Sequence, residues 1–91
     1  GRVMLIHVIQ DDIDKANRIR NGPGPSPALV RYCPVFLAIE RSGYPVSYVG
    51  VAMAFVGDVE YPLSKRTIRQ IARWDKTWRM SPFNFRFGVP A

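Results

Sequence analysis

Basic residues gather in the last third of the chain and are the side chains best suited to binding a ligand. Residues 1–60 carry equal numbers of basic and acidic residues, so the net charge of +6 arises entirely from residues 61–91. This segment has one acid, Asp75, and seven cations: Lys65, Arg66, Arg69, Arg73, Lys76, Arg79 and Arg86. A positive field attracts anions and steers them toward the surface, so we expect an anionic partner.

The spacing of these cations predicts an amphipathic helix over residues 65–78. At about 100° per residue, five of them fall within an arc about 100° wide: Lys65, Arg66, Arg69, Arg73 and Lys76. The opposite side holds the residues expected in the core: Ile68, Ile71, Ala72, Trp74 and Trp78. No Glu is interleaved to balance the basic face. The pattern favours a ridge that binds phosphates; the alternative is a solvated face without a ligand.

The start of this helix offers a second anion-binding feature. Ser64 is expected to cap it, and Lys65 and Arg66 occupy its first turn, where the helix dipole disfavours cations. A hydroxyl, free backbone N–H groups and two cations together predict a phosphate cradle, the alternative being a small electrostatic cost. Arg86 alternates with phenylalanines and is expected to point from the core toward the ridge, and Tyr44 and Tyr48 flank a turn and are candidates for stacking on a base.

Three further residues could carry chemistry, and a structural role is the simpler interpretation of each. His7 is the only histidine and has no ligand at metal spacing. Cys33 begins a helix, which would lower its pKa and make it somewhat reactive, but no nucleophile motif surrounds it, so capping or packing is expected. Asp75 lies among apolar helical positions and needs hydrogen-bond donors there. We find no Gly-rich phosphate loop, close carboxylate pair or triad, and therefore expect neither an enzyme nor a cofactor or metal.

The elements that must position these residues alternate between strand and helix. Residues 2–9 read as a strand that is apolar on both faces, residues 11–18 as a short helix with acids in its first turn, and residues 21–27 as a Pro/Gly-rich surface loop. Cys33-Pro34 opens a helix that Ser42-Gly43 ends. Residues 46–56 read as one strand, Gly57-Asp58 as a hairpin turn into residues 59–61, and Phe83, Phe85 and Phe87 as one face of a last strand. This order predicts an α+β fold, with an antiparallel sheet of about four strands packed with two or three helices.

Length and composition limit the class of protein. Ninety-one residues predict a single domain spanning residues 1–91, and the longest apolar stretch, residues 46–56, is shorter than the about 20 residues of a membrane-spanning helix. One cysteine excludes an intrachain disulfide and a cysteine-based zinc site, so we expect a cytoplasmic protein that does not bind membranes. Because both faces of residues 46–56 are apolar in so small a domain, the sequence also predicts a homo-oligomer.

Several short motifs follow one another along the chain: Asp12-Ile13-Asp14, Cys33-Pro34-Val35 with Leu37-Ala38, Tyr61-Pro62-Leu63, Trp74-Asp75 and Pro82-Phe83-Asn84-Phe85. In this order they resemble a group of short, uncharacterised phage and prophage accessory proteins, with a longer loop at residues 21–27 and Trp78-Arg79-Met80 in place of a Gly-containing turn. The resemblance implies a phage origin and hence the host cytoplasm, and it brings no catalytic residue. Small phage accessory proteins commonly act by binding, for example by countering a host defence.

Two classes of function therefore remain. The first is a non-enzymatic protein that binds a nucleotide signal or nucleic acid through the basic helix. The second is a protein-interaction module that inhibits a host complex by meeting an acidic surface on it.

Overall fold

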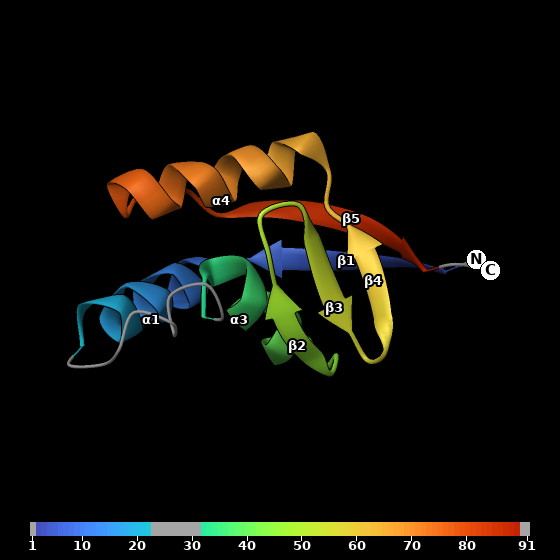
Figure 1. Cartoon of the computed structure of the whole chain (residues 1–91). Coiled ribbons are helices and arrows are strands. Elements are labelled where there is room, and N and C mark those ends of the chain that lie inside the picture. Colours follow the sequence, from blue (N-terminus) through green and yellow to red (C-terminus); the bar gives the residue numbers. More distant parts are fainter. Residues whose placement is uncertain (1, 23–31, 90–91) are drawn as a thin grey trace.

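The first and last strands of the chain pair with each other and form the spine of the fold (Figure 1). The computed structural model describes residues 2–22 and 32–89. Strands β1 (Arg2–Val8) and β5 (Phe83–Val89) make an antiparallel two-stranded ribbon in which Ile6 lies opposite Phe85. Side chains alternate across a strand, and Met4, Ile6 and Val8 are buried on the inner face. The sequence predicted a strand that is apolar on both faces, but Val3 and Leu5 point to an outer face that is exposed.

A second antiparallel sheet has the order β2-β3-β4. Its strands are β2 (Val46–Val49), β3 (Met53–Val56) and β4 (Val59–Pro62). The α+β class is confirmed, with the five strands divided between two sheets rather than joined in one. The hairpin at Gly57-Asp58 is also confirmed: Gly57 has φ = 62°, a left-handed conformation that glycine adopts at little cost.

The single strand expected over residues 46–56 is wrong. Residues 50–52 form a turn in which the Gly50 N–H donates to the Met53 carbonyl (2.8 Å), and Val51 at its tip is 79% exposed. A Cβ at residue 50 would lie 2.9 Å from the Tyr48 ring and 3.0 Å from the Met53 sulfur, so a larger residue here would displace these two side chains. The homo-oligomer was predicted from one long strand that is apolar on both faces, and the structure does not contain that strand.

Within the described residues, three helices pack around these sheets. Helix α1 (Gln10–Asn21) is longer than the residues 11–18 expected. Helix α3 (Pro34–Arg41) begins as predicted, with Cys33 as its N-cap and Pro34 in its first turn. Helix α4 (Lys65–Thr77) also begins as predicted: the Oγ of Ser64 accepts a hydrogen bond from the Thr67 N–H (3.2 Å). The loop predicted at residues 21–27 falls mostly on residues 23–31, outside the described part of the chain.

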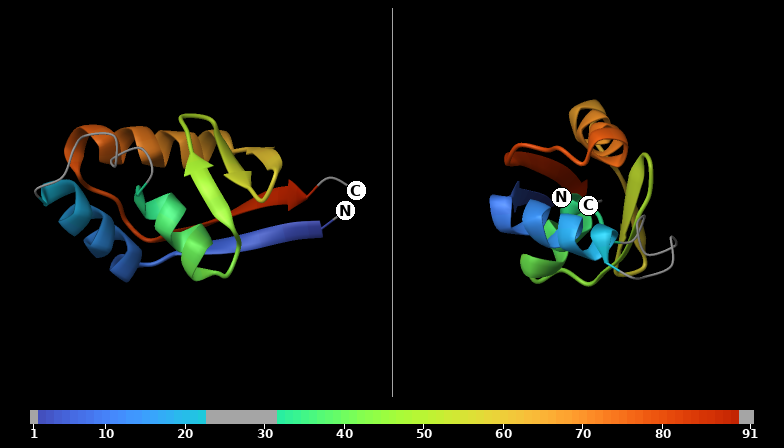
Figure 2. Two further views of the ribbon diagram at one scale, coloured as in Figure 1. Left: turned by 60° about the horizontal axis from the view of Figure 1, so that its bottom comes forward. Right: turned by 90° about the vertical axis from the view of Figure 1, so that its left-hand side faces the viewer.

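The core lies between the ribbon and the three-stranded sheet, with α3 alongside β1 and α4 alongside β5 (Figure 2). Trp74 from α4, Ile6 from β1 and Ile39 from α3 are completely buried at its centre. The ribbon extends beyond the helices at the end where β1 begins and β5 finishes, and the molecule is elongated, measuring 41 × 24 × 20 Å.

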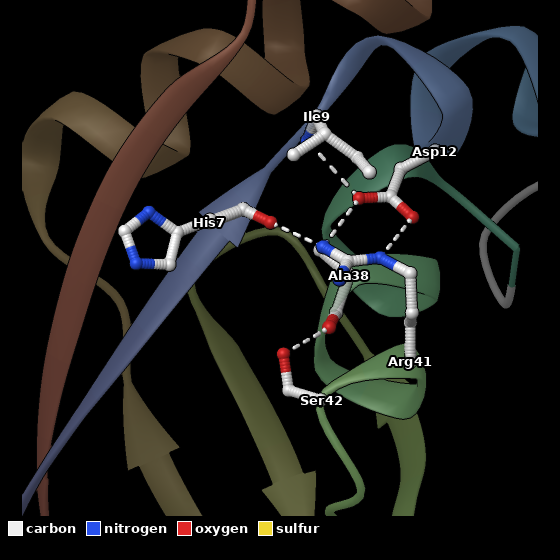
Figure 3. A network of polar contacts seen from close by, with 6 residues as sticks. All are labelled: His7, Ile9, Asp12, Ala38, Arg41 and Ser42. Carbon is white, nitrogen blue, oxygen red and sulfur yellow. Dashed lines mark hydrogen bonds and ion pairs between the residues drawn. The ribbon is translucent and has the colours of Figure 1, made fainter.

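A polar network ties β1, α1 and α3 together at the edge of this core (Figure 3). Asp12 is 4% exposed, and its carboxylate accepts a hydrogen bond from the Ile9 N–H (3.1 Å) at the start of α1. Arg41 at the end of α3 donates to both carboxylate oxygens, from Nε (3.0 Å) and from Nη2 (3.1 Å), and Nη2 also donates to the His7 carbonyl (2.7 Å). Because one guanidinium holds a strand and a helix, this network fixes where the ribbon meets α1 and α3.

Candidate anion-binding surface

Helix α4 presents the predicted row of cations to solvent. We call this row the basic ridge: Lys65, Arg66, Arg69, Arg73 and Lys76, all exposed. The opposite face is fixed to the core by Thr67, Ile71 and Trp74, all buried. Because the buried face cannot turn, the five cations are held together on the outward side. The predicted clustering on one face of the helix is therefore present.

The prediction that Ala72 and Trp78 lie on the core side of this helix is wrong. Ala72 is exposed, and Trp78 is 38% exposed. Trp78 lies beyond the helical turns as the C-cap, with φ = 62°, so it no longer follows the helical period. Left-handed backbone is uncommon for a bulky side chain. The apolar face of α4 is consequently narrower than the sequence suggested.

The C-terminal end of α4 is held by α1 through contacts that sequence reasoning missed. The guanidinium of Arg20 donates to the carbonyls of Trp74 (2.9 Å) and Asp75 (2.6 Å), and its carbon lies 4.8 Å and 4.3 Å from the ring centres of Trp74 and Trp78. Asn17 accepts a hydrogen bond from the Trp74 indole (2.7 Å). A cation beside the last carbonyls is favourable at the negative end of the helix dipole. This clamp fixes the direction of the basic ridge.

The ridge is not neutralised by the acids of the chain. Within residues 2–22 and 32–89, the ion pair is that of Arg41 on α3 with Asp12 on α1, and neither residue belongs to α4. Asp75 belongs to α4 but not to the ridge, and its side chain is exposed rather than enclosed among apolar residues as expected. Partial burial raises the pKa of Asp75, an effect that the charge of Arg20 partly offsets. Since no acid of the described residues forms an ion pair with the ridge cations, they remain available to an external anion.

Three of the predicted anion-binding residues from two elements meet in one shallow groove. Ser64 and Arg66 at the start of α4 and Arg86 on β5 line it, together with Leu5, Asn84 and Phe85. The Arg66 guanidinium carbon lies 5.8 Å from the ring centre of Phe83, which directs this side chain across β5. Arg86 is exposed opposite Leu5 in the ribbon. The groove therefore continues the basic ridge onto the outer face of the ribbon.

The start of α4 has some, but not all, of the features expected of a phosphate cradle. The Ser64 hydroxyl is already engaged by the Thr67 N–H and lies 2.9 Å from the Thr67 hydroxyl. In the part of the chain that the structure describes, no hydrogen bond uses the N–H of Lys65 or of Arg66. Those N–H groups, rather than the Ser64 hydroxyl, are the donors left for an anion.

The two candidate stacking residues lie away from this groove. Tyr44 is half-buried and packs against the core. Tyr48 on β2 is 41% exposed, and its ring is tilted against Phe55 at a centroid distance of 6.3 Å. Neither lines the groove beside α4. The structure therefore does not bring the predicted aromatics and cations together.

Cys33 and His7 both have structural partners. The Cys33 sulfur accepts a hydrogen bond from the Phe36 N–H (3.4 Å), which confirms capping. The lowered pKa expected for this thiol is wrong: burial raises its pKa to about 11, because the thiolate would be desolvated. His7 is exposed and its Nδ1 lies 2.7 Å from Oδ1 of Asn84 across the ribbon. Among the described residues there is no cluster of three or more His, Cys, Asp or Glu side chains that could hold a metal ion.

An apolar cavity beside α4 is too small to enclose a nucleotide. It has a volume of about 100 Å³ between α4 and the β2–β3 turn, and its lining includes Cys33, Val51 and Asp75 but no cation. Pockets for drug-sized ligands usually measure about 300–1,000 Å³. The groove that Ser64, Arg66 and Arg86 line is larger, about 530 Å³, but it is shallow and open, so a ligand of the basic ridge would lie on an open surface.

No protein-family model matches the chain, and comparisons with curated proteins and with solved structures likewise find no match. Over residues 2–22 and 32–89, none of the helices has the length and apolar character needed to cross a membrane.

Proposed function

We propose that this protein is a non-enzymatic binding protein whose ligand is nucleic acid, held through the phosphate backbone by the basic ridge of α4. The observation that carries the proposal is the row of five exposed cations, none of which forms an ion pair within the described residues. A phosphate backbone attracts such a row, and neutralising it releases condensed counterions.

The shape of the surface favours a polymer over a small nucleotide. Lys65 and Lys76 are eleven residues apart on one helix, and at a rise of about 1.5 Å per residue the ridge is about 16 Å long. One strand of duplex DNA presents a phosphate about every 3.4 Å along the axis, so the ridge has the length of about five phosphates. An open, extended row of cations suits an extended anion, whereas a small nucleotide is usually enclosed.

Fluorescence anisotropy with labelled 20-mers of single-stranded DNA, duplex DNA and RNA, titrated between 50 and 200 mM NaCl, tests the proposal. Five phosphate contacts predict that the logarithm of the affinity falls against the logarithm of the salt concentration with a slope of about −3.5 for a single strand and about −4.5 for a duplex. A slope near zero, or no binding of any of the three, would refute it.

A matched pair of variants locates the contact. Arg69→Gln with Arg73→Gln removes two ridge charges, whereas Lys15→Gln with Arg18→Gln removes two exposed charges of α1. Both doubles lower the net charge equally, so only a local contact distinguishes them. We expect the ridge double to weaken binding about 25- to 60-fold at 0.1 M salt and to reduce the slope by about 1.4–1.8, and the α1 double to change it less than about twofold. Equal losses would show that net charge alone attracts the ligand.

A thermal-shift panel of cyclic and linear nucleotides distinguishes a polymer from a small ligand. Stabilisation by a nucleotide, without binding of any oligonucleotide, would show that the ligand is a small anion and not nucleic acid.

A further inference from the structure

The outer edge of β1 is open along the first half of the strand. In an antiparallel pair, alternate residues direct both backbone groups to the same edge. Figure 3 shows the His7 carbonyl pointing away from β5 toward Arg41, with which it is hydrogen-bonded (2.7 Å). Val3 and Leu5 share this parity, so their N–H and C=O groups also face away from β5. Within the described residues, no hydrogen bond connects these groups to another element.

This edge lacks the protection found at the two edges of the second sheet. Natural proteins blunt exposed edges with proline, charged side chains or bulges. At the edge of the second sheet, β2 follows Pro45 and has a register shift between Val46 and Tyr48, and β4 ends at Pro62. Residues 3–8 of β1 contain no proline, no charged residue and no register irregularity, and the charged residue of the strand, Arg2, stands at its start. An unprotected edge is a template for pairing with another strand.

The side chains beside this edge fit a second copy of the same strand. Val3 and Leu5 are 65% and 45% exposed on the outer face of the ribbon. In an antiparallel pair of two β1 strands related by a two-fold axis, Val3 of one copy lies opposite Leu5 of the other. Each such pair exchanges backbone hydrogen bonds and places one apolar side chain against another. This register leaves the bond between His7 and Arg41 intact.

Charge does not oppose this arrangement at the contact. The basic ridge belongs to α4, which lies alongside β5 rather than β1 (Figure 2). In this register Arg2, the charged residue of β1, lies opposite Ile6 of the other copy, so no two charged residues of the strand face each other. A foreign strand, in contrast, has nothing in the structure to select it.

We propose that two copies of this chain pair antiparallel through the outer edges of β1 at Val3 and Leu5, which joins their ribbons into one continuous sheet. This contact borders the groove of Ser64, Arg66 and Arg86, which Leu5 also lines.

Sedimentation velocity between about 1 and about 300 µM, where mass action drives association, measures the dimer. We expect wild-type protein to dimerise and Leu5→Lys to raise the dissociation constant at least tenfold, because an edge lysine blocks pairing. Val59→Lys is the matched control, since Val59 is 39% exposed on β4, and it is expected to change the constant less than twofold. A monomer throughout the range, or a dimer that Leu5→Lys leaves intact, overturns the proposal.

Hydrogen exchange on the wild-type protein tests the same contact without a substitution. The amides of Val3 and Leu5 are expected to exchange fast at low concentration and at least tenfold more slowly at high concentration. The Val51 amide, in the exposed turn, should exchange at one rate throughout. Equal exchange of Val3 and Leu5 at both concentrations would place any dimer contact elsewhere and overturn the proposal.

Discussion

Replacing Arg41 by Ala should strongly destabilise the fold, although this side chain is exposed over 44% of its area. The substitution removes two hydrogen bonds to the Asp12 carboxylate and one to the His7 carbonyl. Asp12, 4% exposed, would keep only the N–H of Ile9 as a partner. An uncompensated charge is left at the edge of the core.

The size of the effect follows from burial. Removing one partner of a fully buried ion pair costs about 3–5 kcal/mol. Water reaches the guanidinium of Arg41, so we take about half of this, about 2 kcal/mol, which corresponds to a fall in Tm of about 8–16 °C for a domain of this size. The Asp12 carboxylate raises the pKa of Arg41 above its ordinary value. Because an elevated pKa keeps the arginine charged below that value, its contribution is present throughout the neutral range and would be lost only in strong alkali.

Urea unfolding followed by the fluorescence of buried Trp74 measures the loss of stability. Arg18→Ala, which removes an exposed arginine of α1, is the matched control and should change stability by less than about 0.5 kcal/mol. A double-mutant cycle with Asp12→Ala should give a coupling energy of at least about 1 kcal/mol. If Arg41→Ala costs no more than the control, or if the two substitutions are additive, the network does not hold the elements together.

Three further predictions concern single residues. At Trp78, with φ = 62°, Gly should give a protein about 1 kcal/mol more stable than Ala does, the reverse of the usual order in a helix, because only Gly adopts this backbone freely; equal thermal unfolding of the two variants would contradict this. Burial raises the pKa of Cys33 from 9.0 to about 11, so iodoacetamide at pH 8 should alkylate this thiol only in urea, as measured by mass spectrometry. The free energy of unfolding should also fall as the pH rises from 9 through 11, because the unfolded thiol ionises first. Rapid alkylation of the native protein would count against this prediction. Burial raises the pKa of Asp75, so its ionised form disfavours folding, and Asp75→Asn should raise Tm at pH 7. This gain in Tm should shrink as the pH falls toward the ordinary pKa of a carboxyl group. A gain that is constant from pH 3 to 7 would exclude this cause.

Local signals in the sequence located the helix starts and one hairpin. Cys33-Pro34 and Ser64 act through hydrogen bonds to residues three positions away, and Gly57 acts through its own backbone angle. Such features need no knowledge of the rest of the chain. The basic ridge was predictable for the same reason, since helical spacing alone places its members on one face.

Features that depend on distant residues were not predictable. The turn at residues 50–52 contains no polar residue, and β2 pairs back onto β3 across it. Arg20 reaches a carbonyl 54 residues away, and Arg41 reaches a carboxylate 29 residues away. In the sequence each is one more arginine in a helix, and only the assembled fold shows that both are structural rather than available to a ligand.

The pairing of β1 with β5 also determines when this protein can finish folding during its synthesis. The His7–Asn84 bond joins residues 77 positions apart, and Ile6, at the centre of the core, lies opposite Phe85. While the ribosome still holds β5 in its exit tunnel, β1 has no strand to pair with, and its apolar face stays exposed to solvent or to a chaperone. Closing so long a loop is slow, so the decisive step of folding comes after translation has passed the last strand.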